Sequence, residues 1–177
     1  MKKNRFSIVG YSGHSFVILD SAFRSNLCCK GYFDFNKKEY NPYNLKYLGL
    51  EGKIITNERI MITIGDNNIR RNVYQVLVEK EFITFLNIID PSSSVSKFAV
   101  IKPNSSISIG ANSVINSLAK IEDGVIVNTG AIIEHEVSLG KFSHIGPNAT
   151  VCGNAKIGEN VFIGANAIIM QGISVEP

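Results

Sequence analysis

Residues 109–175 read IGANSVINSLAKIEDGVIVNTGAIIEHEVSLGKFSHIGPNATVCGNAKIGENVFIGANAIIMQGISV, and the rest of the chain is best understood from this stretch. Every sixth residue in it is aliphatic: Ile109, Ile115, Ile121, Val127, Ile133, Leu139, Ile145, Val151, Ile157, Ile163, Ile169 and Val175. A six-residue period matches neither the α-helix, at about 3.6 residues, nor an amphipathic strand, at about 2. It indicates a parallel β-solenoid, in which each hexad supplies a short strand and a bend and three hexads complete one triangular coil.

The repeat predicts how the solenoid packs. Each aliphatic residue should point inward and stack on its equivalent one coil away, because no single hexad can bury its apolar face alone. Asn and Gly residues between the strands suit bends with positive φ. The register begins at Val95, Ile101 and Ile107 and then slips by two residues before Ile115, which predicts a small loop or a loosely wound first coil.

The residues before the repeat predict a small α/β domain with a mostly parallel, Rossmann-like sheet. Short apolar runs alternate with two helical patterns and a polar connecting loop. We expect strands over 6–10, 28–34, 61–67 and 82–89, helices over 16–23 and 68–80, and the loop over 36–53. The polar segment Asp90–Ser94 separates the two regions, so the predicted domains are 1–91 and 92–177.

A glycine-bearing turn between the first strand and the first helix is a candidate anion site. Gly10 and Gly13 precede the helix, whose free N–H groups and dipole favour a bound anion. They match half of a dinucleotide-binding pattern, with Ser15 in the third glycine position, and a tight structural turn explains them equally well. Asp34 follows about twenty residues later, where a carboxylate can bind a ribose or a base edge.

Composition limits the class of protein. The chain has 177 residues, 45% of them hydrophobic and 19% charged, as in ordinary globular proteins. A net charge of +3 is too weak to indicate nucleic-acid binding. No apolar run approaches membrane-spanning length, so no membrane insertion is expected. The three cysteines (Cys28, Cys29 and Cys152) have neither disulfide nor metal-ligand spacing, which favours a reduced, cytoplasmic protein without a metal.

One segment of the solenoid carries residues that its bends do not need. His135 lies between Glu134 and Glu136, and His144 follows nine residues later. A histidine beside a carboxylate is the usual general base near neutral pH, although His135 could also be a solvated bend residue. Half a coil separates the two histidines, on the order of 15 Å across one solenoid. They can share a site only if two solenoids pack side by side, as in a cyclic trimer.

Together these motifs resemble the hexapeptide-repeat sugar acetyltransferases. The resemblance is strongest to the UDP-4-amino-sugar N-acetyltransferases of bacillosamine and perosamine type and to their sialic acid O-acetyltransferase relatives. It rests on residues 10–14, 32–34, 64–67, 128–136 and 142–144. The chain differs from relatives in having Phe35 where a second acid is frequent, and in stopping at Pro177, where they continue for another coil.

The resemblance implies a left-handed β-helix, a homotrimer with active sites between subunits, and acetyl-CoA as the acyl donor. It also implies roles for individual residues. His135 would be the catalytic base and Glu136 would raise its basicity. His144, Gly153, Gly164 and Ala165 would contact acetyl-CoA, and Ser12, Gly13, His14, Asp34, Gly65 and Asn128 would bind the nucleotide-sugar.

The predicted reaction is acetyl transfer from acetyl-CoA to the amine of a nucleotide-linked 4-amino sugar. The amine would attack the thioester directly, and His135 would accept its proton. An alternative acceptor is a hydroxyl group of sialic acid or of another sugar. A third possibility is a non-catalytic trimer that only binds nucleotide-sugars. The sequence does not choose the sugar, the nucleotide or the glycan pathway.

Overall fold

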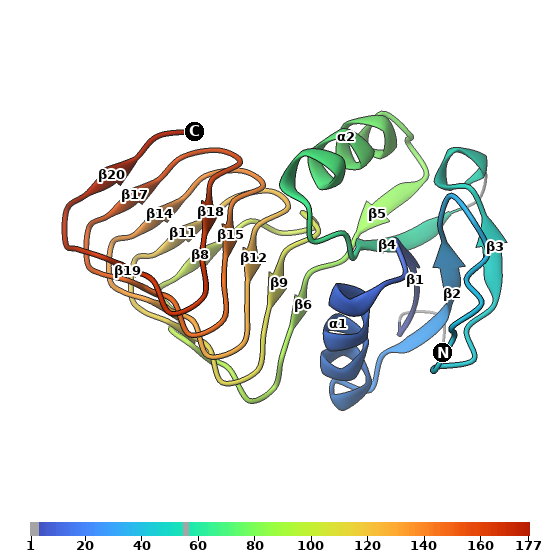
Figure 1. The fold of residues 1–177 in the computed structure, drawn as a ribbon, viewed down its shortest axis with the longest axis horizontal. Helices are drawn as coiled ribbons and strands as arrows, with labels where there is room; N and C mark the ends of the chain where they lie inside the picture. The colour runs from blue at the N-terminus through green and yellow to red at the C-terminus, as the bar shows by residue number, and fades with distance from the viewer. Residues whose placement is uncertain (1–3, 55–56) are drawn as a thin grey trace.

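The computed structural model describes residues 4–54 and 57–177. An N-terminal α/β domain packs against one side of a β-solenoid whose coils advance away from it toward the C-terminus (Figure 1). The predicted first domain, residues 1–91, includes residues 1–3 and 55–56, which lie outside the described residues.

The α/β domain has a parallel sheet with the strand order β3-β2-β1-β4-β5. Its elements are β1 (Arg5–Val9), α1 (Gly13–Arg24), β2 (Cys28–Phe33), β3 (Tyr47–Gly49), a 3-10 turn (Glu51–Lys53), β4 (Glu58–Ile62), α2 (Asn67–Val78) and β5 (Ile83–Phe85). The order reverses between β1 and β4, and ligands of such sheets bind at that point beyond the carboxyl ends of the strands. The residues there are Gly10 and the β4–α2 loop, Thr63–Asp66.

Fifteen short parallel strands form the solenoid's three faces. The first face contains β6 (Ile88–Ile89), β9 (Ser108–Ile109), β12 (Ile126–Val127), β15 (His144–Ile145) and β18 (Phe162–Ile163). The second contains β7 (Ser94–Val95), β10 (Val114–Ile115), β13 (Ile132–Ile133), β16 (Thr150–Val151) and β19 (Ile168–Ile169). The third contains β8 (Val100–Ile101), β11 (Lys120–Ile121), β14 (Ser138–Leu139), β17 (Lys156–Ile157) and β20 (Ser174–Val175).

The packing of the solenoid confirms the predicted hexad register and a left-handed β-helix fold. Inward residues stack directly, as where Ile115 pairs with Ile133 and Ile133 with Val151. These three side chains are at most 1% exposed. The bends use asparagine at positive φ, for example Asn148 (55°) and Asn154 (56°), where most other L-residues are strained. The core is therefore one continuous aliphatic column.

Two predicted elements were wrong in detail. The single strand expected over 82–89 is divided, because β5 ends the α/β sheet and β6 opens the solenoid by pairing with β9. The loop expected over 36–53 contains β3 and the 3-10 turn. Isolated runs of three residues carry too little periodicity to be recognised.

The slip in the register also lies elsewhere than predicted. Ile101 and Ile109, not Ile107, occupy successive inward positions, so the two additional residues fall before Ile109. This longer segment reaches the α/β domain, because the Ser106 hydroxyl accepts a hydrogen bond from the Ile62 backbone N–H at 2.9 Å. The irregular coil is therefore a docking point between the two parts of the chain.

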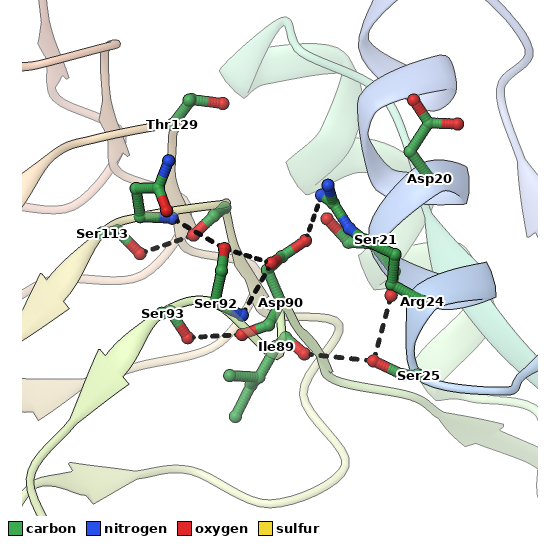
Figure 2. Close-up of polar contacts among 12 residues, drawn as sticks. Asp20, Ser21, Arg24, Ser25, Ile89, Asp90, Ser92, Ser93, Ser113 and Thr129 are labelled. Carbon is green, nitrogen blue, oxygen red and sulfur yellow. Dashed lines mark hydrogen bonds and ion pairs between the residues drawn. The ribbon is translucent and has the colours of Figure 1, made fainter.

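An ion pair between the half-exposed Arg24 and the buried Asp90 also joins α1 to the first coil (Figure 2). Asp90 is 1% exposed, pairs with Arg24, and accepts hydrogen bonds from the backbone N–H (2.9 Å) and hydroxyl (2.6 Å) of Ser92. Burial alone would raise the pKa of Asp90, but polar contacts with Ser21, Ser92 and Arg24 outweigh it and lower the pKa to about 2.

Candidate active site

His135 and Glu136 form a contact at the corner between the second and third faces. They lie in the bend that follows β13, and Nδ1 of His135 is 3.1 Å from Oε2 of Glu136. Both side chains are about half exposed, at 53% and 55%. Since an ionised carboxylate only accepts hydrogen bonds, Nδ1 carries the proton and Nε2 presents its lone pair. This arrangement can accept a proton from a bound molecule.

Gly153, one coil further on, lies directly against the imidazole of His135. A Cβ atom on Gly153 would be 2.5 Å from Cε1 and 2.6 Å from Nε2 of that ring. Only a residue without a side chain lets the ring occupy this place. Gly153 therefore leaves the space that the imidazole occupies, and Glu136 holds the ring there through its Nδ1 atom.

A second cluster lies on the first face, where β15 projects His144 outward. The ring nitrogen Nε2 of His144 is 3.3 Å from the amide nitrogen of Asn128. The ring of His14, from α1, approaches with its centroid 5.8 Å away, and Phe162 packs edge-on at 5.0 Å. The cluster thus combines one histidine from each domain.

Both histidines of this cluster are neutral near pH 7. Burial, followed by the positive charge of Arg70, lowers the pKa of His144 to about 4, although a hydrogen bond with the Gly65 backbone opposes the shift. Burial lowers the pKa of His14 to about 4, with further contributions from His144 and Arg70. His144 can therefore offer a neutral imidazole to a ligand.

His144 borders an open cleft of about 510 Å³ between the domains. The β4–α2 loop and the C-terminal coils line it with Gly65, Asp66, Asn67, Asn68, His144, Asn160 and Phe162. Asn67 donates from its side chain to the backbone carbonyl of Asn160 at 2.9 Å, which ties the cleft's two walls together. Asn67 belongs to a motif recognised in the sequence, whereas Asn160 gave no signal because it resembles any other bend asparagine.

A second cleft, of about 360 Å³, lies at the switch point of the α/β sheet. Gly10, Ser12, Asp34 and Phe35 are among its lining residues, together with Ile64 of the β4–α2 loop. Gly10 has φ of 90°, and a Cβ atom there would be 2.5 Å from a side-chain carbon of Ile64. The two clefts adjoin at the β4–α2 loop, since Ile64 faces one and Gly65 the other.

Asp34 organises the glycine-bearing turn. Its Oδ2 atom accepts a hydrogen bond from the Tyr11 backbone N–H at 2.9 Å, and Oδ1 lies 3.0 Å from the Lys38 ammonium group. Each oxygen can still accept a further hydrogen bond from a ligand. Ser12 is exposed and is the N-cap residue of α1, and Gly13 is its first residue, so both lie at the positive end of the helix.

The predicted site residues therefore lie in four places within one chain. His135, Glu136 and Gly153 lie at the corner of the second and third faces, and His14, Gly65, Asn128 and His144 lie on and above the first face. Ser12 and Asp34 border the switch-point cleft, and Gly13 follows Ser12 at the start of α1. Gly164 and Ala165 follow β18, at the corner between the first and second faces. The structure of one chain does not bring His135 and His144 to the same side of the solenoid.

The part of the chain that the structure describes contains no group of three or more His, Cys, Asp or Glu residues placed to hold a metal ion. Among the described helices, none has the length and apolar character needed to span a bilayer.

Two family models match the two parts of this fold, the α/β domain with its switch-point cleft and the solenoid of hexads. Residues 5–77 match the PglD N-terminal domain, and residues 136–171 match the bacterial transferase hexapeptide (six repeats). The chain combines both domains, which confirms the resemblance predicted from its sequence.

Solved structures share this architecture along almost the whole chain. PerB from Caulobacter crescentus, in complex with CoA and GDP-perosamine, is 23% identical with a TM-score of 0.87, covering 99% of this chain and 84% of PerB. The acetyltransferase domain of PglB from Neisseria gonorrhoeae FA1090, in complex with acetyl coenzyme A, is 22% identical with a TM-score of 0.79, covering 98% and 96%. A comparison with curated protein sequences finds no match.

Proposed function

We propose that this protein is an acetyl-CoA-dependent N-acetyltransferase that acts on the amine of a nucleotide-linked 4-amino sugar. The contact between His135 and Glu136 carries the proposal, because it places an oriented base at an accessible corner of the solenoid. PerB, which has the same fold, binds CoA and GDP-perosamine, and one of its variants replaces a histidine with alanine. Those ligands supply the two substrate classes that we assign here.

The chemistry follows from the free lone pair on Nε2 of His135. The sugar amine attacks the thioester carbonyl carbon, a C–N bond forms, and the nitrogen passes its proton to Nε2. Collapse of the tetrahedral adduct breaks the C–S bond, and the CoA thiolate takes the proton back from the imidazolium. Glu136 stabilises the transient imidazolium, and no covalent enzyme intermediate is needed.

The nucleotide part of the acceptor belongs in the switch-point cleft. Its phosphates would meet the exposed N-terminus of α1 at Ser12 and Gly13, and Asp34 would accept a hydrogen bond from the nucleoside. The sugar would then extend past Gly65 toward the interdomain cleft. There His14, Asn128 and His144 offer neutral hydrogen-bonding groups to it or to the acetyl group.

A cyclic trimer completes the site, and the outward residues of the three faces support a particular packing. The α/β domain covers the first face, and the third presents Val100, Lys120, Ser138, Lys156 and Ser174. The second face presents the more apolar series Ser94, Val114, Ile132, Thr150 and Ile168. We therefore place the second face toward the three-fold axis.

This packing brings the two separated clusters together. With the second face inward, the His135 corner of each subunit meets its neighbour's corner between the first and second faces. Asn128, Gly164 and Ala165 lie at that corner, next to the strand that carries His144. Acetyl-CoA would lie in the seam with its thioester between the imidazoles of two subunits.

Release of free CoA thiol, measured with UDP-, GDP- and dTDP-linked 4-amino sugars, tests the proposal. At least one of these should be acetylated with a kcat/KM in the ordinary enzymatic range, about 10⁴ M⁻¹s⁻¹ or more. Sialic acids serve as hydroxyl acceptors in the same assay. Faster turnover of a hydroxyl acceptor would contradict N-acetylation, and failure of the intact protein to bind acetyl-CoA would contradict acyl transfer.

A further inference from the structure

Arg70 has the largest fully buried side chain among the described residues, and it lies at the junction of the two domains. It is in the first turns of α2, and the five N–H groups of its guanidinium all donate hydrogen bonds to neutral oxygen atoms. The acceptors are the backbone carbonyls of Ile64 (3.1 Å), Gly65 (2.9 Å), Gly124 (2.8 Å) and Phe142 (2.7 Å) and the side-chain oxygen of Asn67 (2.8 Å).

These acceptors come from two separate parts of the fold. Ile64 and Gly65 belong to the β4–α2 loop, which forms one wall of the interdomain cleft. Gly124 and Phe142 occupy equivalent bends of successive coils, both at positive φ (63° and 58°). A Cβ atom on Gly124 would be 2.4 Å from the Phe142 ring, so that ring covers the glycine and both carbonyls remain available to the guanidinium. Arginine's rigid planar fork suits such a set of acceptors.

His144 is attached to both parts that Arg70 joins. It follows Phe142 by two residues at the start of β15, and its imidazole also makes a hydrogen bond with the backbone of Gly65. The guanidinium therefore holds both Gly65, which bonds to this ring, and Phe142, which precedes it in the chain. Removing it would free the cleft wall and the solenoid bend to move independently.

We propose that Arg70 is a positioning residue of the acyl-transfer site, whose guanidinium locks the cleft wall at Gly65 to the bend at Phe142 and so holds the His144 imidazole in place. The consequence for turnover rests on the proposed function. The placement and charge of His144 do not, and they can be measured separately.

The surrounding charges agree with this role. Arg70 keeps its proton near neutrality, since burial lowers its pKa only to about 10 and Asp66 opposes the shift. The ionisable groups that approach His144 are Arg70 from α2, His14 from α1 and Asp66 from the cleft wall. Of these, the charge of Arg70 disfavours a positive charge on His144. The acid Asp66 is engaged at the start of α2, where it accepts from the Ile69 N–H at 2.9 Å.

Two substitutions separate the guanidinium's charge from its hydrogen bonds. Arg70→Met removes both, and Arg70→Lys keeps the charge but replaces the five-donor fork with a single ammonium. Arg71→Met is the matched control, because Arg71 lies next in α2 and makes only a peripheral 3.8 Å ion pair with Glu159. The readouts are NMR titration of the three histidines in the intact protein, with signals assigned by single His substitutions, and steady-state kinetics of acetyl transfer.

In Arg70→Met, the His144 signal should titrate at a clearly higher pH than in the wild type, and kcat/KM should fall ~10- to 100-fold. Arg70→Lys should keep the low titration point but raise the KM for the sugar, and Arg71→Met should change neither readout. An unshifted His144 titration in folded Arg70→Met overturns the proposal. Wild-type kinetics in Arg70→Lys would also overturn the proposal. This second variant keeps the proposal testable if Arg70→Met does not fold. If the wild type shows no acetyl transfer, the proposed function fails, and the titration alone decides whether Arg70 holds His144 uncharged.

Discussion

At the scale of single residues, the orientation of His135 is set by its direct neighbour in the sequence. Replacing His135 with alanine should lower kcat by ~10²–10⁴-fold, because a positioned base contributes that much, and should leave the KM for acetyl-CoA nearly unchanged. Glu136→Gln should lower kcat less, since the amide still contacts Nδ1 but no longer stabilises the imidazolium. Thiol release under saturating substrates measures both effects.

Glu134 provides the control for that experiment. It flanks His135 on the other side, but its carboxylate accepts a hydrogen bond from the Asn116 side chain at 3.0 Å instead. Glu134→Gln should therefore retain kcat. Full activity in His135→Ala, or an equal loss in both glutamate variants, would remove His135 from the role of base.

Gly153 offers a more stringent test of the same geometry. In Gly153→Ala the new methyl group would overlap the His135 ring, which must then swing away and lose its contact with Glu136. We expect kcat to fall about 10²-fold while thermal stability changes little, because the displaced ring is half exposed. Gly52→Ala is the control, since a Cβ atom there meets no other atom within 4 Å. Unchanged kcat in Gly153→Ala would show that turnover does not depend on the position of the His135 ring seen here.

Sequence could reveal only some of these residues, for a physical reason. His135 and Glu136 are adjacent, so their pairing follows from local geometry and was visible as a motif. Arg70 sits in a helix among ordinary polar residues, and its acceptors are backbone carbonyls of distant bends. Every residue type has a backbone carbonyl, so the sequence of those bends does not indicate such a contact. The burial of Arg70 could be recognised only in the folded structure.

At the scale of elements, the hexads were predictable because each repeats the same inward contact, whereas β5 and β6 were not. A run such as 82–89 looks like one apolar strand until its partners are known, and here its two halves pair with different sheets. The domain junction is thus decided by tertiary contacts. The contacts at this junction also dock α1 onto the first coil, and their contribution to the free energy of unfolding can be measured.

Asp90 should make that docking sensitive to acid. Its pKa is about 2 in the folded protein, against 3.8 ordinarily, so the unfolded chain binds more protons between these values. The stabilisation is therefore complete above pH 3.8 and is lost as the pH falls toward 2. Asp90→Asn should lower the free energy of unfolding by about 1–3 kcal/mol at pH 7, since hydrogen bonds to a charged group are lost.

Urea unfolding at several pH values measures both effects. Below pH 3.8 the difference between Asp90→Asn and the wild type should shrink, because the unfolded wild-type chain then binds protons at Asp90 that the folded chain does not. Glu122→Gln is the control: its ion pair with Lys102 is 3.7 Å long and half exposed, so we expect a loss of less than about 1 kcal/mol. A pH-independent difference for Asp90→Asn would rule out ionisation as the cause.

At the scale of the whole molecule, the apolar second face should be what holds the proposed trimer together. Ile132 projects from the middle of this face, so Ile132→Asp should place a charge against the three-fold axis and yield monomers in light scattering. Activity should fall at least ~100-fold, although every histidine of the chain remains. Ser138→Asp, on the third face, should leave the trimer intact. A monomeric Ile132→Asp protein with full activity would show that one chain contains a complete site.

A mixing experiment tests whether each site is shared between subunits. In His135→Ala every site lacks the base, and in His144→Ala every site lacks the opposing imidazole, so each variant alone should have little activity. When the two are co-expressed in equal amounts and assemble randomly, a site is complete if its His135 comes from one variant and its His144 from the other. About one site in four then meets that condition, so about a quarter of the wild-type activity should return. Sites contained within one subunit could never be restored in this way, because each chain would still carry its own defect, and the mixture would remain as inactive as its components.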